Sequence, residues 1–380
     1  MHILIAPNAF KHSLDASEAA FAIQDGLLQS RLACTCTCFP IGDGGDGTAN
    51  LIIAQRGGTL VPSIVHDALG RNIHTSFGLI DEGMTAVIEM ANASGIRTLK
   101  DHELNPLLAN SFGTGEQIKA ALDLGVKKVI IAMGGTATVD GGIGILRALG
   151  AKCMDAAGNE IATPGALGEL VSIDTVGLDT RIPACEFIIL CDVNNPLIGT
   201  NGAAEVFAPQ KGAKGGDVQQ LATGLSKFAE VADMLTGKAI ASLHHGGAAG
   251  GAAAGLHGFL DARLVNGIDY YLHLTEFNAA LAKADLVITG EGSIDAQTLE
   301  GKGPIGVARQ ARLLNKIVVA MAGKVPLEPH PGLQQYFDVL MPISHQPEAL
   351  TAALQHTRLN LQRSAFTLGD ILAVRRVASA

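Results

Sequence analysis

The stretch Leu286–Gly306 limits the possible folds of this chain more than any other segment. It begins with a short apolar run, Leu286–Thr289, of the length expected for a strand buried on both faces. Glycines and polar side chains follow from Gly290, and a helical pattern begins near Ile305. A strand that ends in glycines, acids and a lysine before a helix is typical of the ligand-binding edge of an open α/β sheet. The alternative is a tight turn whose charges are solvated.

Four other apolar runs end in the same way, with glycine beside acidic, hydroxyl or lysine side chains. These ends lie near Lys11, Asp43, Thr136 and Asp192. A single apolar run that ends in this way is weak evidence for a binding site. Together they predict an α/β protein in which two lobes contribute loops to one cleft.

The spacing of the apolar runs changes twice along the chain. Strands alternate with helices up to residue 60, and short alternating strands then follow between Leu60 and Met90. Alternation of strands and helices returns near residue 285. We therefore expect two domains: residues 1–60 with 285–380 form one α/β domain, and residues 61–284 form an inserted mixed α/β domain.

Charge and hydropathy exclude two classes of protein. The formal net charge of −9 and the lack of a Lys/Arg run argue against a nucleic-acid groove. No apolar run approaches the length of a membrane span, and the first residues do not resemble a signal peptide. We expect a cytoplasmic protein. Cys34, Cys36 and Cys38 alternate with threonines on one face of a strand, which indicates buried free thiols rather than a zinc site.

Candidate ligands for a metal and for phosphate lie in the loops after the strands. Asp43 and Asp46 are separated by glycines, so the loop can bring two carboxylates to one point, as suits Mg²⁺; a structural turn is the alternative. Lys11 lies near a helix N-terminus, where phosphate binds readily, although a solvated lysine is an equal alternative. Thr136 and Thr138 follow a buried strand in a glycine-rich loop that an anion or a sugar acid can approach closely.

This combination of acids, lysines, glycines and hydroxyls is typical of phosphoryl transfer. The nucleotide loop G-x-x-x-x-G-K-[ST] is absent, because neither Gly237–Lys238 nor Gly301–Lys302 is followed by Ser or Thr. The residues alone predict a phosphate-handling α/β enzyme. A dehydrogenase is a second enzyme alternative, weakened because Gly290–Glu291–Gly292 lacks the rest of a dinucleotide fingerprint. A non-catalytic regulator that senses nucleotides or sugar acids is the alternative from another class.

Four motifs connect the chain to a known family: APNAFKHSL, GDGGDGT, GGTATVDGG and ITGEGSIDAQTLEGKGP. In this order they resemble the bacterial glycerate kinases of the 2-kinase type, and the resemblance runs from Ile3 to about Gly323. It implies phosphorylation of D-glycerate to 2-phosphoglycerate with ATP and Mg²⁺, in glyoxylate or glucarate breakdown. It also implies a flavodoxin-like parallel-sheet domain built from both chain ends and an inserted domain akin to restriction endonucleases, with the active site in the cleft between them.

With this resemblance, the loop residues receive hypothetical roles. Asp192 is the candidate base for the acceptor hydroxyl, with a turn-capping role as the alternative. Asp43 and Asp295 are the candidate Mg²⁺ ligands, and Asp295 and Lys11 join Asp192 as candidate catalytic residues. The candidate contacts to substrate and phosphate are Ser13, Thr136, Thr138, Asn194, Glu291, Gly292 and Lys302.

The chain departs from the family pattern at two of three positions. Asn8 stands where the family commonly has Ser, Asp46 keeps an acidic charge, and Val139 stands where a polar Asn is common. Val139 therefore offers no polar group to a ligand. The residues do not separate glycerate from another short hydroxy acid, or 2- from 3-phosphorylation, and a homodimer is left open.

Overall fold

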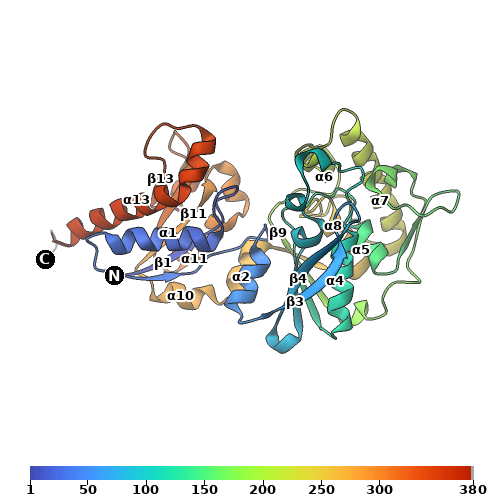
Figure 1. Ribbon diagram of the computed structural model, residues 1–380, viewed down its shortest axis with the longest axis horizontal. Helices are drawn as coiled ribbons and strands as arrows, with labels where there is room; N and C mark the ends of the chain where they lie inside the picture. Colours follow the sequence, from blue (N-terminus) through green and yellow to red (C-terminus); the bar gives the residue numbers. More distant parts are fainter. Residues whose placement is uncertain (378–380) are drawn as a thin grey trace. The chain divides into compact units, whose positions relative to one another are not determined.

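The computed structural model describes residues 1–377 and divides the chain into two compact units (Figure 1). The first unit contains Met1–Asp43 and the chain from Ile268 onward, and the second contains Gly44–Gly267. The sequence placed the boundaries at residues 60/61 and 284/285 instead. Packing explains the difference, because helix α2 (Thr48–Gln55) packs against strands of the second unit, and helix α10 (Phe277–Lys283) packs against a strand of the first.

The first unit is built on a five-stranded sheet in which all neighbouring strands are parallel. Its order is β2-β1-β11-β12-β13, with strands β1 (His2–Pro7), β2 (Thr35–Cys38), β11 (Leu286–Ser293), β12 (Ile317–Lys324) and β13 (Val339–Pro342). Counted within the unit, this is the 2-1-3-4-5 order of flavodoxin-like sheets. The strand order reverses between β1 and β11, and ligands bind such sheets at that point.

Helices cover this sheet. Helices α1 (Ala16–Gln29) and α13 (Leu350–Val377) lie side by side and share one core with Ile3 and Ile288 of the strands (Figure 1). Helix α11 (Gly303–Leu313) connects β11 to β12, and α1 connects β1 to β2. These two right-handed connections run in opposite directions from the point where the strand order reverses, so α1 and α11 lie on opposite faces of the sheet. The shorter helices of the unit are α9 (Gly267–Leu274), α12 (Pro331–Gln334) and the 3-10 helix η7 (Ala296–Glu300).

Helix α1 begins at Ala16, with Asp15 as its N-cap. The Asp15 carboxylate accepts a hydrogen bond from Glu18 N–H at 2.8 Å, and the Glu18 carboxylate accepts one from Asp15 N–H at 3.0 Å. This reciprocal capping box satisfies backbone donors at the helix start. It also fixes the end of the turn that carries Lys11.

Strand β11 extends further than predicted. The apolar run was expected to stop at Gly290, but the strand continues to Ser293, with Glu291 opposite Ala322 of β12. A Cβ on Gly290 would lie 2.0 Å from the Met321 carbonyl oxygen, so only glycine allows the two strands to approach this closely. Glu291 is therefore held on a paired strand and not in the loop that follows it.

The second unit contains a six-stranded mixed sheet of order β10-β9-β6-β5-β4-β3. The predicted meander is confirmed, since β3/β4 and β4/β5 are antiparallel pairs. The other pairs, β5/β6, β6/β9 and β9/β10, are parallel. The strands are β3 (Thr59–His66), β4 (Asn72–Ile80), β5 (Thr85–Glu89), β6 (Lys128–Ala132), β9 (Glu186–Cys191) and β10 (Arg263–Asn266), beside a separate antiparallel pair, β7 (Lys152–Met154) and β8 (Ser172–Asp174).

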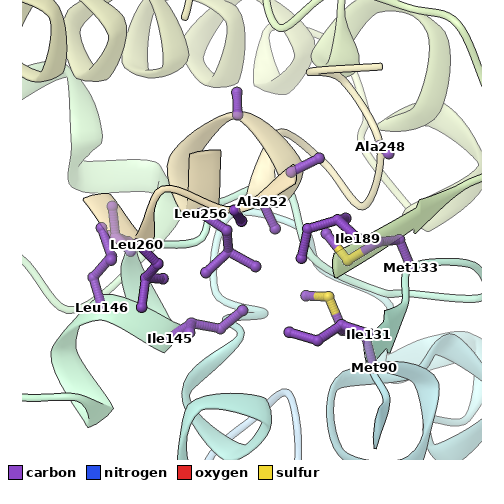
Figure 2. Close-up of a cluster of buried hydrophobic side chains, with 14 of the residues drawn as sticks. Met90, Ile131, Met133, Ile145, Leu146, Ile189, Ala248, Ala252, Leu256 and Leu260 are labelled. Atoms are coloured by element: carbon purple, nitrogen blue, oxygen red, sulfur yellow. The ribbon is translucent and has the colours of Figure 1, made fainter. Parts of the chain in front are cut away.

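Helices of the second unit pack on this sheet around a large apolar core. Figure 2 shows part of it, where Ile131 and Ile189 of neighbouring strands lie with Leu256 of α8. Helix α8 begins inside the Gly/Ala tract at 245–258. The helices are α2, α3 (Ala91–Ser94), α4 (Phe112–Asp123), α5 (Ile143–Ala148), α6 (Ala203–Phe207), α7 (Asp217–Thr236) and α8 (Ala252–Leu260), with 3-10 turns η1 (Asp81–Gly83), η2 (Ile96–Thr98), η3 (Asp101–Glu103), η4 (Pro164–Glu169), η5 (Ile182–Ala184) and η6 (Pro209–Lys211).

The helices and the cysteines have two further properties. Within residues 1–377, no helix combines the length and the apolar character of a membrane span. Cys34, Cys36 and Cys38 are free thiols, half-buried against the core of the first unit. Burial, and then the neighbouring Cys34, raise the pKa of Cys36 to about 12, so this thiol stays protonated near neutral pH.

Candidate active site

The first polar centre lies at the switch point of the first unit, where β1 and β11 end. The chain leaves β1 at Asn8, whose N–H donates to the Gly290 carbonyl at 2.8 Å. The Asn8 side chain donates to Asp43 Oδ2 at 2.8 Å, and Gly303 N–H donates to the same oxygen at 3.4 Å. Asp43 is therefore held at the start of α11, where the helix dipole stabilises negative charge.

Glu291 is the buried carboxylate of this centre, with only 9% of the residue exposed. Its Oε1 accepts a hydrogen bond from Thr298 Oγ1 at 3.2 Å. Burial, and then the nearby Asp43 carboxylate, raise the pKa of Glu291 to about 7, although Lys302, the Thr298 hydrogen bond and Lys11 lower it. A cation would stabilise two carboxylates in this arrangement.

Asp295 caps the short helix η7 that follows β11. Its Oδ1 accepts from Gln297 N–H at 3.0 Å, and the Ser293 hydroxyl donates to Oδ2 at 3.4 Å. Asp295 N–H donates to Thr298 Oγ1 at 3.2 Å. Because the Thr298 hydroxyl also donates to Glu291, one threonine positions both acidic residues.

Two lysines lie near these acids. Lys11 is exposed in the turn after β1, and a Cβ on Gly292 would lie 3.8 Å from Lys11 N, so the two main chains pass close together. Lys302 is the N-cap of α11, with Pro304 in the first turn. The first N–H groups of this helix have no partner within the helix and favour an anion such as phosphate. Both ammonium groups lower the pKa of the Glu291 carboxyl, Lys302 more than Lys11.

Ser13 has a structural contact in this unit. Its hydroxyl donates to the Leu354 carbonyl of α13 at 2.6 Å and ties the turn to that helix. The hydroxyl proton is therefore already in use. A contact between Ser13 and substrate stays a prediction.

A second polar centre lies in the second unit, in the loop after β6. Asp140 is fully buried and accepts hydrogen bonds from Ser111 N–H at 2.8 Å and the Ser111 hydroxyl at 2.7 Å. It also accepts from Gly142 N–H at 2.9 Å and Gly144 N–H at 3.2 Å. These bonds fold residues 134–142 into a tight loop. The Val139 side chain packs into the apolar core, in agreement with its lack of a polar group.

Lys211 joins this loop to η6. Only 4% of the residue is exposed, and its Nζ donates to Thr136 Oγ1 at 3.1 Å and to the Thr138 carbonyl at 2.7 Å. Burial lowers the pKa of Lys211 to about 8, although Asp140 and Asp192 raise it. The structure thus brings Thr136 and Thr138 together around a buried ammonium, whose charged form the Asp192 carboxylate favours.

Asp192 and Asn194 follow β9 beside this loop. The segment is fixed by its neighbours: His245 Nδ1 lies 2.6 Å from the Val193 carbonyl oxygen, and Gly247 N–H donates to the Asn195 carbonyl at 2.8 Å. The negative charge of Asp192 raises the pKa of Lys211. Its role as a base stays a prediction.

A third group of charges surrounds Glu89 at the end of β5. This carboxylate is 1% exposed and accepts from Gly47 N–H at 3.0 Å and Ala49 N–H at 3.2 Å, at the start of α2. Arg97 pairs with Asp46 and lies 3.4 Å from Glu89 Oε1. Burial, and then a hydrogen bond shared with Asp46, raise the pKa of Glu89 to about 7. Asp46, which the sequence paired with Asp43, belongs to this group.

The donor set of the first centre fits Mg²⁺. Among the side chains that the structure describes, no cluster of three or more His, Cys, Asp or Glu is arranged to hold a metal by itself. Mg²⁺ needs fewer protein ligands, because it is commonly held by one or two carboxylates together with water and substrate phosphates. Asp43 raises the pKa of buried Glu291, and a divalent cation would relieve this repulsion. The role of Asp295 as a metal ligand stays a prediction.

Lys211, Glu89 and Arg97 were not predicted as site residues from the sequence. Glu89 is an acidic residue at the end of the apolar strand Thr85–Glu89. Asp192 was chosen because it ends an apolar run, so the same criterion could have identified Glu89. Lys211 and Arg97 lie in polar segments, and their partners are far away in the sequence. No local pattern distinguishes them from solvated charges.

Comparison with known proteins adds independent findings. A sequence model described as the glycerate kinase family matches residues 3–373. The chain is 41% identical to a glycerate kinase of Bacillus subtilis over 96% of both chains, and 40% identical to a glycerate 2-kinase of Escherichia coli over 98% of both. A crystal structure of a candidate glycerate kinase 2 from Salmonella typhimurium matches with a TM-score of 0.82 and 40% identity over 99% of both chains.

Proposed function

This chain belongs to the glycerate kinase family, and from that premise we propose that it transfers a phosphoryl group from ATP to the 2-hydroxyl of D-glycerate. The choice of the 2-position is supported by the Escherichia coli relative, which is named a glycerate 2-kinase. The observation that carries the proposal is the gathering of Asp43, Glu291, Lys11 and Lys302 at the switch point of a flavodoxin-ordered sheet. Acids and ammonium groups beside a helix N-terminus suit a nucleotide with its metal.

The acids of the first centre would hold Mg²⁺. Asp43 and Asp295 are the proposed ligands, and Glu291 adds negative charge beside Asp43. Bound Mg²⁺ supplies neutralisation of the charge on phosphate oxygens. The protein orients these acids through neutral donors: Asn8 holds Asp43, and Thr298 holds both Glu291 and Asp295.

Phosphate binding is assigned to the lysines of the same centre. Lys11 and Lys302 each neutralise phosphate oxygens, and the N–H groups at the start of α11 add hydrogen bonds. Gly292 keeps the main chain of β11 open beside Lys11. These groups bind and orient ATP before transfer.

The acceptor is assigned to the second centre. The carboxylate of Asp192 takes the proton of the 2-hydroxyl while the new O–P bond forms and the bond between the γ-phosphorus and ADP breaks. Thr136, Thr138 and Asn194 are the proposed hydrogen-bonding partners of the small acid. The Thr138 hydroxyl is buried and has no hydrogen-bond partner among the described residues, so it can serve such a ligand.

ADP release measured over a panel of short hydroxy acids tests the proposal. D-glycerate should be the best substrate among D-glycerate, L-glycerate, glycolate and lactate, and phosphorus NMR should identify 2-phosphoglycerate. Turnover that prefers another acid would assign the chain to that substrate instead. Binding of ATP without turnover of any acid would favour the non-catalytic regulator.

A further inference from the structure

Lys211 is a charged side chain in the interior of the second unit to which the proposed reaction gives no role. Its ammonium donates to the Thr136 hydroxyl at 3.1 Å and to the Thr138 carbonyl at 2.7 Å. Lysine is almost never fully buried without partners, because removal of its charge from water is unfavourable. Two neutral oxygen acceptors do not balance that charge, so nearby carboxylates must contribute.

Two carboxylates act on Lys211 from different elements. Asp140, in the loop after β6, and Asp192, after β9, both raise the pKa of Lys211 against the effect of burial. Asp140 is fully buried and already accepts hydrogen bonds from Ser111, Gly142 and Gly144. Asp192 is partly exposed and can still face a ligand. The charges of a structural carboxylate and of a candidate catalytic one thus both favour the charged form of this ammonium, which is bound to the loop of Thr136 and Thr138.

We propose that Lys211 is a positioning residue for phosphoryl transfer, whose charged ammonium fixes the loop of Thr136 and Thr138 and orients the Asp192 carboxylate toward the acceptor hydroxyl. This inference rests on the proposed function, because it requires Asp192 to act on an acceptor. Lys211 itself contacts no reacting atom. Without its charge, the loop loses its common donor and Asp192 loses its neighbouring cation.

Lys238 of the same unit provides a matched control. Its Nζ donates to the His257 carbonyl at 3.0 Å and to the Asp261 carboxylate at 2.8 Å. Lys238 therefore donates to a main-chain carbonyl, as Lys211 does. Lys238, His257 and Asp261 have no role in the proposed reaction.

The first test compares Lys211→Met with Lys238→Met in the full chain. The Lys211 variant should lose about a hundredfold in kcat/KM for D-glycerate, because a small misplacement of reacting groups has effects of that size. Its KM for ATP should change by less than about twofold, because the ATP contacts remain. Lys238→Met should keep both constants.

The second test separates positioning from a purely structural role by pH. Lys211 loses its charge as pH rises through about 8, so wild-type kcat/KM for D-glycerate should fall in that range. Asp140 and Asp192 are the charged groups that act on it. Lys211→Gln keeps a donor but has no charge that titrates. It should have low activity at all pH values and should lack this alkaline decline.

The outcomes separate this inference from the proposed function. An active wild type, with Lys211 variants that are equally active or retain the alkaline decline, overturns the role of Lys211 alone. A wild type that phosphorylates no hydroxy acid overturns both proposals. Circular dichroism measures whether Lys211→Met and Lys211→Gln fold. If neither variant folds, the inference is also overturned, because Lys211 is then needed for the fold itself.

Discussion

Replacement of Glu291 by Gln should stabilise the first unit at alkaline pH. The substitution preserves size and leaves an oxygen that can accept the Thr298 hydrogen bond, which is 3.2 Å long in the structure. It removes a carboxylate that is buried beside Asp43. The same change should lower kinase activity, since it takes one negative charge from the proposed metal and nucleotide site.

The size of the stabilisation follows from the pKa of Glu291, which rises from 4.5 to about 7. At about 1.4 kcal/mol per pH unit, the ionised side chain costs the folded state on the order of 3 kcal/mol above pH 7. A carboxyl whose pKa is raised by folding contributes stability below about pH 4.5, and this contribution is lost as pH rises through about 7. The gain from Glu291→Gln should therefore be small at pH 5 and complete at pH 8.

Calorimetry of metal-free and nucleotide-free protein at the two pH values checks this prediction. A gain of about 3 kcal/mol corresponds to a rise of roughly 6–12 °C in the transition temperature of a unit of this size. Glu328→Gln, at an exposed position in the same unit, is the control and should change little. A Glu291→Gln variant that gains no stability at pH 8, or gains equally at both pH values, would refute the reasoning.

Three further substitutions test the proposed roles one at a time. Asp43→Asn should fold normally yet be close to inactive, and normal turnover at low Mg²⁺ would remove Asp43 from the metal site. Lys11→Met should lower kcat/KM for ATP by at least about tenfold, or roughly 1.4 kcal/mol, whereas unchanged ATP kinetics would make it a solvated surface lysine. Asp192→Asn should slow the phosphoryl-transfer step by about a hundredfold or more in single-turnover measurements with nearly normal binding. A turn-capping role for Asp192 would instead lower thermal stability and leave that step intact.

Much of the fold could be predicted because its signals are local. The alternation of apolar residues predicted the meander of β3, β4 and β5. The extent of β11 could not be predicted from its glycines and acids. Glu291 lies on the strand because β12 pairs with it, and that partner begins about thirty residues later.

Some residues of the candidate site could likewise be predicted from the sequence, and others could not. Asp43, Glu291 and Lys302 could be recognised because Asp43 and Glu291 follow apolar runs of the sequence and Lys302 precedes a helical pattern. Lys211 could not, because its partners Thr136 and Thr138 are more than seventy residues away and only the fold brings them together. Arg97 likewise meets Asp46 across about fifty residues. Charges in polar loops have no local pattern that separates buried partners from solvated ones.

Phosphorus NMR of the reaction of this protein with ATP, Mg²⁺ and D-glycerate tests the central claim most directly. The spectrum should show ADP and 2-phosphoglycerate forming at equal rates, and Asp43→Asn should form neither. A spectrum with 3-phosphoglycerate as the product would contradict the proposed position of transfer. ATP that remains intact beside D-glycerate would contradict the proposed activity itself.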